Sequence, residues 1–307
     1  GLYHLRPDTS RPLEFANPGF SSEFAEALLS SGAATQPVRM GGLDFLPHNP
    51  RGLEAVANQF LGSGKGIEVL HHSDICGAET AGGRLVSISV QTRGVLRNFH
   101  ASAFVDATGD AELVAMAGAP FEIAAPEQLQ RPACVCGLGG IPAELVSGDA
   151  RLRLAHSIAR GVAEGALPRA ALGASFRAGI PGDIWMSIDL DASPYDPLDP
   201  SCLTRIERES RTLVVLILNH LRACVPGFGG VFLCQFPAQA GIRESRRMRG
   251  KICLSAKDLL SGKSGADSVA FSAWPLELRE TARGPKFVFP DGHRSAGIPG
   301  GALRSSA

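Results

Sequence analysis

The stretch Ala103-Phe-Val-Asp-Ala-Thr-Gly-Asp-Ala-Glu-Leu-Val-Ala-Met-Ala-Gly-Ala-Pro120 is the part of this chain that most constrains its fold. Its apolar start, Ala103–Val105, predicts a short strand, and the small residues over about 111–117 predict a helix. The turn between them, residues 106–110, contains Thr-Gly, which lets a ligand pass close to the backbone. The residues alone leave two interpretations open: a cofactor-binding turn, or an ordinary strand-to-helix turn in which Asp110 caps the helix.

Upstream of this stretch, the sequence predicts helices and a group of strands. Asn49-Pro50 is a cap followed by proline at the first helical position. Apolar residues then repeat at helical spacing, at Leu53, Val56, Ala57, Phe60 and Leu61. Strands are expected over Gly66–His72, Cys76–Ala81, Arg84–Gln91 and Val95–His100, with a turn at Gly82-Gly83.

Downstream, longer helices and strands alternate. Helices are expected over Leu152–Leu167 and Ser201–Leu221, with a short helix opened by a capping box at 255–258. Strands are expected over Pro132–Gly139, Asp183–Leu190, Val231–Phe236, Trp274–Leu278 and Lys286–Phe289. The linker-like run at 124–128 predicts a boundary between domains 1–122 and 123–307. The fold class expected from this order is α/β, in its mixed α+β form.

Composition excludes several classes of function. The 307 residues carry 30 Lys+Arg and 30 Asp+Glu, and this zero net charge argues against nucleic-acid binding. No apolar run is long enough to span a bilayer, so we expect no membrane association. The seven cysteines are odd in number and show no C-x-x-C spacing, which favours a reducing, cytoplasmic context without disulfides. Cys134 and Cys136 would share one face of a strand, either as a pair or, more simply, as buried apolar side chains. The expected partner is a small-molecule substrate, with a homo-oligomer or a complementing chain left open.

Common catalytic motifs are missing from the sequence. It has no G-x-G-x-x-G loop, which normally brings a dinucleotide pyrophosphate to a helix N-terminus. It has no G-x-S-x-G elbow, which argues against a serine hydrolase of the usual α/β type. Its eight His residues show no metal-ligand spacing, so we predict no metal site.

A second constellation is the Arg-rich run Gln239-Ala-Gly-Ile-Arg-Glu-Ser-Arg-Arg-Met-Arg249. If this run is extended, Arg243, Ser245 and Arg247 share one face, and Glu244 and Arg246 share the other. Arginine fixes carboxylates and phosphates bidentately, so the run suits an anion site. A salt-bridged surface strand is the alternative.

Glu277 and Arg279 form a similar pair, because they lie two residues apart in the expected strand Trp274–Leu278 and its continuation. Both would face the same side of that strand. They could line a pocket, or they could pair with each other.

Three segments together resemble one family. They are 104–122, the run 241–250 with its continuations at 254–260 and 267–270, and Trp274-Pro-Leu-Glu-Leu-Arg-Glu280 running on to Gly297-Ile-Pro299. Their order and spacing are similar to those of FAD-dependent oxidoreductases of the glutathione-reductase-like two-domain group. The nearest type within it is the succinate dehydrogenase/fumarate reductase flavoprotein. The resemblance implies a partial Rossmann-like FAD domain with a β-meander over 1–122, and a mixed-sheet substrate or cap domain over 123–307.

The resemblance also implies site residues. The turn Ala107-Thr108-Gly109-Asp110 would bind FAD on its adenosine side. Arg243, Glu244 and Arg246 would face the substrate or the flavin as the catalytic group. Glu277 and Arg279 would line the same substrate pocket.

Two functions follow from the resemblance as expectations. In the first, the chain belongs to an FAD-dependent oxidoreductase that transfers a hydride between FAD and a small organic, anionic substrate. In the second, it is a non-catalytic fragment or a subunit that needs a partner chain to complete the FAD site. The second expectation reflects two features that the resemblance implies and the sequence lacks, an N-terminal Gly-rich loop and a C-terminal segment with its own Gly-rich turn, together with a first residue, Gly1, that is not Met. These suggest truncation at both ends.

Overall fold

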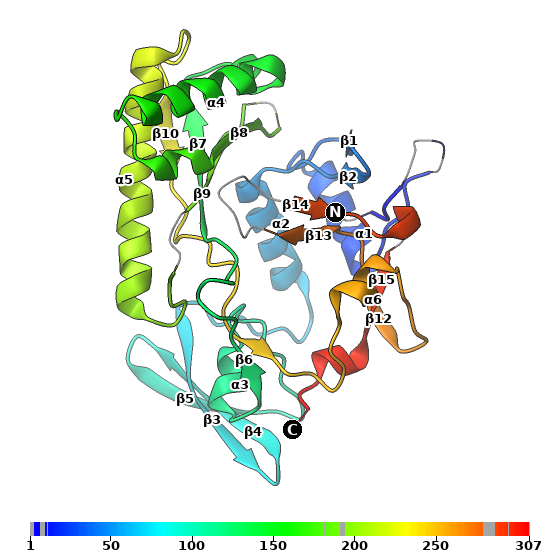
Figure 1. The fold of residues 1–307 in the computed structure, drawn as a ribbon. Helices are drawn as coiled ribbons and strands as arrows, with labels where there is room; N and C mark the ends of the chain where they lie inside the picture. The colour runs from blue at the N-terminus through cyan, green and yellow to red at the C-terminus, as the bar shows by residue number, and fades with distance from the viewer. Residues whose placement is uncertain are drawn as a thin grey trace.

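Helices and small β-sheets alternate along the chain, so the mixed α/β class predicted from the sequence is confirmed (Figure 1). The structure is a computed structural model that describes residues 3–6, 10, 12–180, 182–190, 194–278, 286–293 and 295–306. Within these residues one sheet has four strands, one has three and four have two.

The largest sheet carries the main core of the molecule. Its strands are β7 (Ala133–Gly139), β8 (Ala174–Ala178), β9 (Ile184–Asp189) and β10 (Phe232–Gln235), paired antiparallel in the order β10-β7-β9-β8. Two long helices pack on it, α4 (Gly148–Ala163) and α5 (Pro200–Cys224) (Figure 1). The helices and strands predicted here are therefore confirmed, with ends shifted by a few residues. Cys134 and Cys136 are both buried in this core, and burial raises the pKa of Cys136 to about 12.

A second, smaller core lies near the N-terminus. It is built by α1 (Phe20–Ser30) and α2 (Pro50–Ser63), and the hairpin of β1 (Val38–Met40) and β2 (Leu43–Phe45) lies next to it. As predicted, Asn49 caps α2, because its side-chain oxygen accepts hydrogen bonds from the backbone N–H groups of Arg51 and Gly52.

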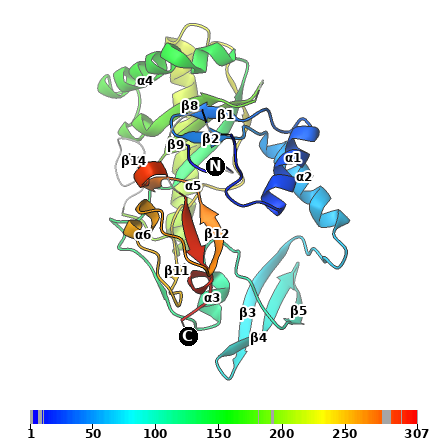
Figure 2. The same ribbon diagram turned by 90° about the vertical axis from the view of Figure 1, so that its right-hand side faces the viewer.

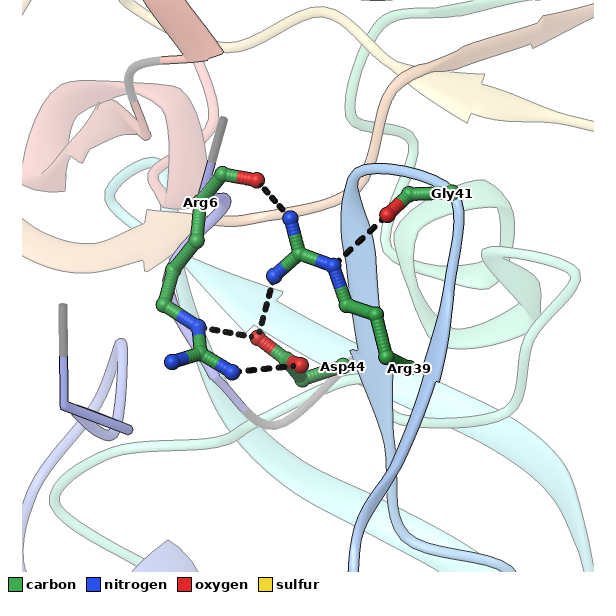
Figure 3. Close-up of polar contacts among 4 residues, drawn as sticks. All are labelled: Arg6, Arg39, Gly41 and Asp44. Carbon is green, nitrogen blue, oxygen red and sulfur yellow. Dashed lines mark hydrogen bonds and ion pairs between the residues drawn. The ribbon is translucent and has the colours of Figure 1, made fainter. Parts of the chain in front are cut away.

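A buried carboxylate holds the N-terminal segment on this hairpin (Figure 3). Asp44 accepts two hydrogen bonds from Arg6, at 2.7 and 2.8 Å, and one from Arg39 at 3.1 Å. Arg39 also donates to the backbone carbonyls of Arg6 and Gly41. The hydrogen bond from Arg6 lowers the pKa of Asp44 from its ordinary value although the carboxylate is buried.

The predicted meander is confirmed and projects from the rest of the molecule (Figures 1 and 2). It consists of β3 (Ser73–Ala81), β4 (Arg84–Thr92) and β5 (Val95–His100), paired antiparallel in that order. Gly82 and Gly83 form the turn between β3 and β4, with positive φ angles of 58° and 73° that favour glycine.

Two predicted strands are wrong. Residues 66–72 and 103–105 belong to no strand and pair with no other segment of the described chain. Both stretches are apolar enough to favour a strand, but a strand forms only where a neighbour supplies hydrogen bonds. As a result Val105 is 88% exposed and Ile67 is 53% exposed. All strand ladders among the described residues are antiparallel.

The C-terminal part of the chain returns to the N-terminal core. Its elements are α6 (Ala256–Leu260) and the paired strands β12 (Ser268–Ser272) with β15 (Ala296–Pro299) and β13 (Leu276–Leu278) with β14 (Lys286–Val288). Asn17 exchanges two hydrogen bonds with the backbone of Phe271, and Trp274 packs edge-on against Phe45. The domain division at residues 122 and 123 stays a prediction.

Short elements connect the two cores, the meander and the C-terminal strands. They are α3 (Glu112–Met116), the paired strands β6 (Phe121–Glu122) and β11 (Arg247–Met248), and single 3-10 turns at Ala143–Val146, Arg169–Gly173, Asp291–His293 and Gly300–Leu303. Among the described helices, none combines the length and the apolar character needed to cross a membrane.

Candidate functional site

The turn at 106–110 is organised by the carboxylate of Asp106. One oxygen accepts hydrogen bonds from the backbone N–H and the hydroxyl of Thr108, at 3.1 and 2.7 Å. The other accepts from the backbone N–H of Val114 in α3 at 3.0 Å. The Thr108 hydroxyl in turn accepts from the N–H of Glu112. Asp106 and Thr108 therefore satisfy the start of α3, and Asp110, expected as its cap, does not.

These contacts set the charge of the turn. Burial acts to raise the pKa of Asp106, but the hydrogen bonds from Thr108 and from the backbone of Val114 and Leu113 outweigh it. The net effect lowers the pKa of Asp106 from its ordinary value, so this carboxylate is ionised near neutral pH.

The Arg-rich run meets this turn, which the sequence did not show. The hydroxyl of Ser245 donates to the Asp110 carboxylate at 2.5 Å, and Arg246 donates to the Asp110 backbone carbonyl at 3.2 Å. The guanidinium of Arg246 also lies 5.8 Å from the ring centre of Phe121. The proposed cofactor turn and the proposed catalytic run are thus in direct contact, although 135 residues separate Ser245 from Asp110.

The other two residues of the proposed catalytic group are held in ion pairs. Arg243 pairs with buried Asp189, at 3.4 Å. Glu244 pairs with Arg247 at 3.5 Å and accepts the backbone N–H of Gln130 at 3.1 Å. Arg247 therefore pairs with Glu244, and the simple alternation of faces expected for an extended strand does not hold here.

Two cavities open on either side of this contact. The first, about 770 Å³, is polar and is lined by Gly109, Ala124, Glu127, Gln128, Gln130, Arg243, Glu244, Ser245, Arg246 and Arg247. The second, about 870 Å³, is more apolar and is lined among others by Phe104, Leu113, Val114, Met248, Leu303 and Arg304. Gly109 and Arg246 line both cavities and so form a common wall. All three proposed catalytic residues line the polar cavity.

Gly109 leaves the backbone open at this wall. Its φ is +87°, a conformation that side chains rarely adopt, and a Cβ built on it meets no atom within 4 Å. A ligand can therefore approach the peptide closely. Arg246 and Arg304 also line the more apolar cavity and suit a negatively charged group, and Phe104 and Leu113 suit a flat apolar ring. This set of donors and apolar walls fits a dinucleotide such as FAD.

The remaining site predictions fall elsewhere. Glu277 accepts a hydrogen bond from the Trp274 indole at 2.9 Å and lines neither cavity. Arg279 lies outside the described residues. Ala107, Thr108 and Asp110 support the turn and line neither cavity directly. No cluster of three or more metal-ligating side chains occurs among the described residues.

Sequence reasoning missed several contributors to the site. Tyr195 donates to the Gln130 carbonyl at 2.8 Å, and burial followed by the charge of Glu244 raises the Tyr195 pKa to about 12. Asp189 anchors Arg243, and Phe121 supports Arg246. No local pattern marks these residues, because each acts through a contact between segments far apart in the sequence.

Comparison with known protein families identifies the family of this chain. The sequence model described as "FAD dependent oxidoreductase" matches residues 3–306, almost the whole chain. The chain belongs to the FAD-dependent oxidoreductase family. The resemblance inferred from its motifs is confirmed at this level, and FAD, the cofactor predicted from the sequence, is the cofactor of the family. A search of curated proteins gives no match.

Solved structures add a distant likeness. The flavin-dependent brominase Bmp2 superposes with a TM-score of 0.41 and 12% identity, over 75% of this chain and 56% of the brominase. The myxobacterial chondrochloren halogenase CndH gives a TM-score of 0.39 and 12% identity, over 67% and 43% of the two chains. This chain thus spans about half the length of these structures. The family assignment rests on the sequence match.

Proposed function

We propose that this chain forms part of an FAD-dependent oxidoreductase that transfers a hydride between FAD and a small anionic organic substrate. One observation carries the proposal: the turn at 106–110 and the Arg-rich run meet at Asp110, and Gly109 and Arg246 separate a polar cavity from a more apolar one. In this proposal the contact would join the wall of an FAD cavity to the wall of an anion-binding cavity.

The chain's own residues would divide the work between the two cavities. Gly109, Phe104, Leu113 and Arg304 would hold FAD in the larger cavity, with Arg246 against its negative charge. When bound, FAD supplies the hydride chemistry, and the protein supplies binding, orientation and electrostatics.

The polar cavity would orient the substrate. Arg243 and Arg246 lie on its wall and offer charged donors to a carboxylate or similar anion. Asp189 fixes the direction of the Arg243 guanidinium. Glu244 accepts a hydrogen bond from the Gln130 N–H and pairs with Arg247. It would therefore hold these two parts of the cavity wall together.

Flavin binding tests the cofactor half of the proposal. The chain is incubated with FAD and desalted, and its visible absorption spectrum is recorded. We expect a retained flavin band, and we expect Arg246→Met to weaken FAD affinity about tenfold or more, since a charged hydrogen bond contributes about 1.5–3 kcal/mol. Arg97→Met is the matched control, because Arg97 lies exposed on β5 away from both cavities.

Either of two results would contradict this half. The first is that neither variant nor parent retains flavin at any FAD concentration. The second is that Arg97→Met and Arg246→Met lower the affinity equally.

A second candidate function is favoured by a different observation. The apolar segments 66–72 and 103–105 are exposed and have no strand partner in the described chain, with Val105 at 88% exposure. An exposed apolar segment whose backbone has no strand partner can pair with a strand of another chain. The chain would then be a subunit completed by a partner that supplies the missing strands and the Gly-rich loop. A monomeric preparation that retains FAD stoichiometrically, measured by light scattering and absorbance together, would contradict this candidate.

A further inference from the structure

A thiol and an imidazole meet at the C-terminal end of α5, far from the two cavities. Cys224 is the last residue of this helix, and His220 lies one turn before it. Helix α4 crosses α5 at this end, whereas α3 and β6 lie at the opposite end of the molecule (Figure 1). Neither Cys224 nor His220 lines the polar or the apolar cavity.

The hydrogen bonds of His220 determine which of its nitrogens faces the thiol as an acceptor. Nε2 lies 3.0 Å from the backbone carbonyl oxygen of Ser157 in α4. A carbonyl oxygen only accepts, so Nε2 carries the proton and donates it. Nδ1 then holds the lone pair, and the Cys224 Sγ lies 3.8 Å from it. The thiol can therefore donate its hydrogen to Nδ1.

The imidazole is fixed in this orientation by α4. Ser157 is buried, and its hydroxyl lies 3.2 Å from the same Nε2. Gly161 faces the ring: a Cβ built there would stand 2.6 Å from the ring carbon Cε1. Only glycine at 161 leaves room for the ring as it lies. Cys224 itself is exposed, so a small reagent can reach its sulfur.

We propose that Cys224, with His220 as its general base, is a modification site for low-molecular-weight disulfides. As the Cys224 sulfur attacks one sulfur of the disulfide, its proton passes to His220 Nδ1. A new sulfur–sulfur bond forms to Cys224, and the original one breaks. The departing sulfur takes the proton from the imidazolium and leaves as a thiol. The disulfide is the oxidant, so one thiol and one disulfide give one mixed disulfide and one thiol.

The helix end makes the imidazole essential to this reactivity. The C-terminal end of a helix favours cations and disfavours anions. At this position the attack is therefore favoured when the thiol proton passes to His220 as the new sulfur–sulfur bond forms. Without the imidazole, Cys224 is expected to react more slowly than an ordinary exposed cysteine.

The other cysteines provide internal references. All seven are described and free, and among the described residues no other one hydrogen-bonds to an imidazole. Cys76 and Cys253 are exposed like Cys224, but their thiols donate only to backbone carbonyls. Cys134 and Cys136 are buried in the main core.

The test measures modification rates at single cysteines in the full chain. The reduced protein is treated at pH 7 with bis(2-hydroxyethyl) disulfide, an uncharged probe, and quenched with acid at intervals. Mixed disulfides are then quantified by peptide mass spectrometry. We expect Cys224 to react at least about fivefold faster than Cys76 and Cys253.

Variants distinguish the effect of the His220 base on the Cys224 rate from the effect of solvent exposure alone. His220→Gln removes the base, and Gly161→Ala displaces the ring while keeping it; both are expected to slow Cys224 to or below the rate of Cys253. His156→Gln, on an exposed position of α4, is the matched control and should leave the rate unchanged. Thermal unfolding and the unchanged rates at Cys76 show that each variant is folded. Equal rates at Cys224, Cys76 and Cys253 in the parent chain, or a Cys224 rate unaffected by both variants, would overturn the proposal.

Discussion

Asp106 shows how one carboxylate builds the turn on which the site depends. Its two oxygens receive hydrogen bonds from Thr108 and from the N-terminal end of α3, and these bonds hold Gly109 open between them. The sequence predicts Thr108 and Gly109 beside a cofactor, but the residue that shapes the turn precedes both. An Asp-x-Thr-Gly pattern can predict such a turn locally, because the aspartate carboxylate accepts a hydrogen bond from the backbone N–H two residues later.

Replacing Asp106 with Asn removes the ionised acceptor. We expect Asp106→Asn to lower the free energy of unfolding at pH 7 by about 1–2 kcal/mol, the range for lost helix-cap bonds. The pKa of Asp106 is depressed in the folded chain, so its contribution is present above the unfolded pKa and is lost as pH falls through the folded pKa. Urea unfolding from pH 7 down to pH 3 measures both effects.

Asp74→Asn is the control for this variant, since Asp74 is exposed on β3. The variant Asp106→Asn should lose less stability than the parent chain between pH 5 and pH 3. An identical acid dependence in parent and variant would show that the turn does not rely on this charge.

At the scale of elements, local sequence signals predicted most helices and the meander, but they did not show which segments lack a strand partner. The cap at Asn49 and the capping box at Ser255 located their helices, because a cap and its helix are adjacent in sequence. The segments 66–72 and 103–105 were expected as strands on apolar content alone, yet a strand also needs a partner that no local pattern supplies. The same limit applies to the site: both of its segments were identified, but their contact at Asp110 was not.

The end of β7 gives a sharp test of backbone packing. Gly140 has a φ of +79°, and a Cβ there would stand 2.1 Å from the carbonyl oxygen of Gly230. Gly140→Ala therefore forces the β7–β10 end apart, and we expect a loss of more than about 2 kcal/mol in urea unfolding. Gly229→Ala is the matched control from the facing segment, because its Cβ would meet nothing within 4 Å. Equal stabilities of the two variants would mean that this end of the sheet relaxes freely.

At the scale of the whole molecule, the two ends of the chain are packed together. The Asn17 side chain exchanges hydrogen bonds with the backbone of Phe271, 254 residues away, and Phe45 packs on Trp274. Such contacts cannot be read from a sequence, because nothing in either segment marks the other. The N-terminal segment is in turn held by the Arg6–Asp44–Arg39 cluster, which makes this cluster a test of the packing as a whole.

Removing the negative charge of Asp44 should loosen both ends of the chain. Asp44→Asn removes the carboxylate that the guanidiniums of Arg6 and Arg39 both contact, and breaking a buried pair in this way costs about 3–5 kcal/mol. We expect lower stability and faster cleavage before residue 30 in limited proteolysis. Glu54→Gln, at an exposed position of α2, should behave like the parent chain. Unchanged proteolysis of Asp44→Asn would show that other contacts hold the N-terminal segment.

The shared wall of Gly109 and Arg246 has a thermodynamic consequence. A single guanidinium borders both cavities, so a ligand that draws it toward one cavity changes the free energy of binding in the other. Linkage makes this coupling reciprocal: whatever factor the first ligand imposes on the second, the second imposes on the first. Occupancy of the two cavities is then cooperative, positively if the first ligand orders Arg246 for both and negatively if the two compete for its charge.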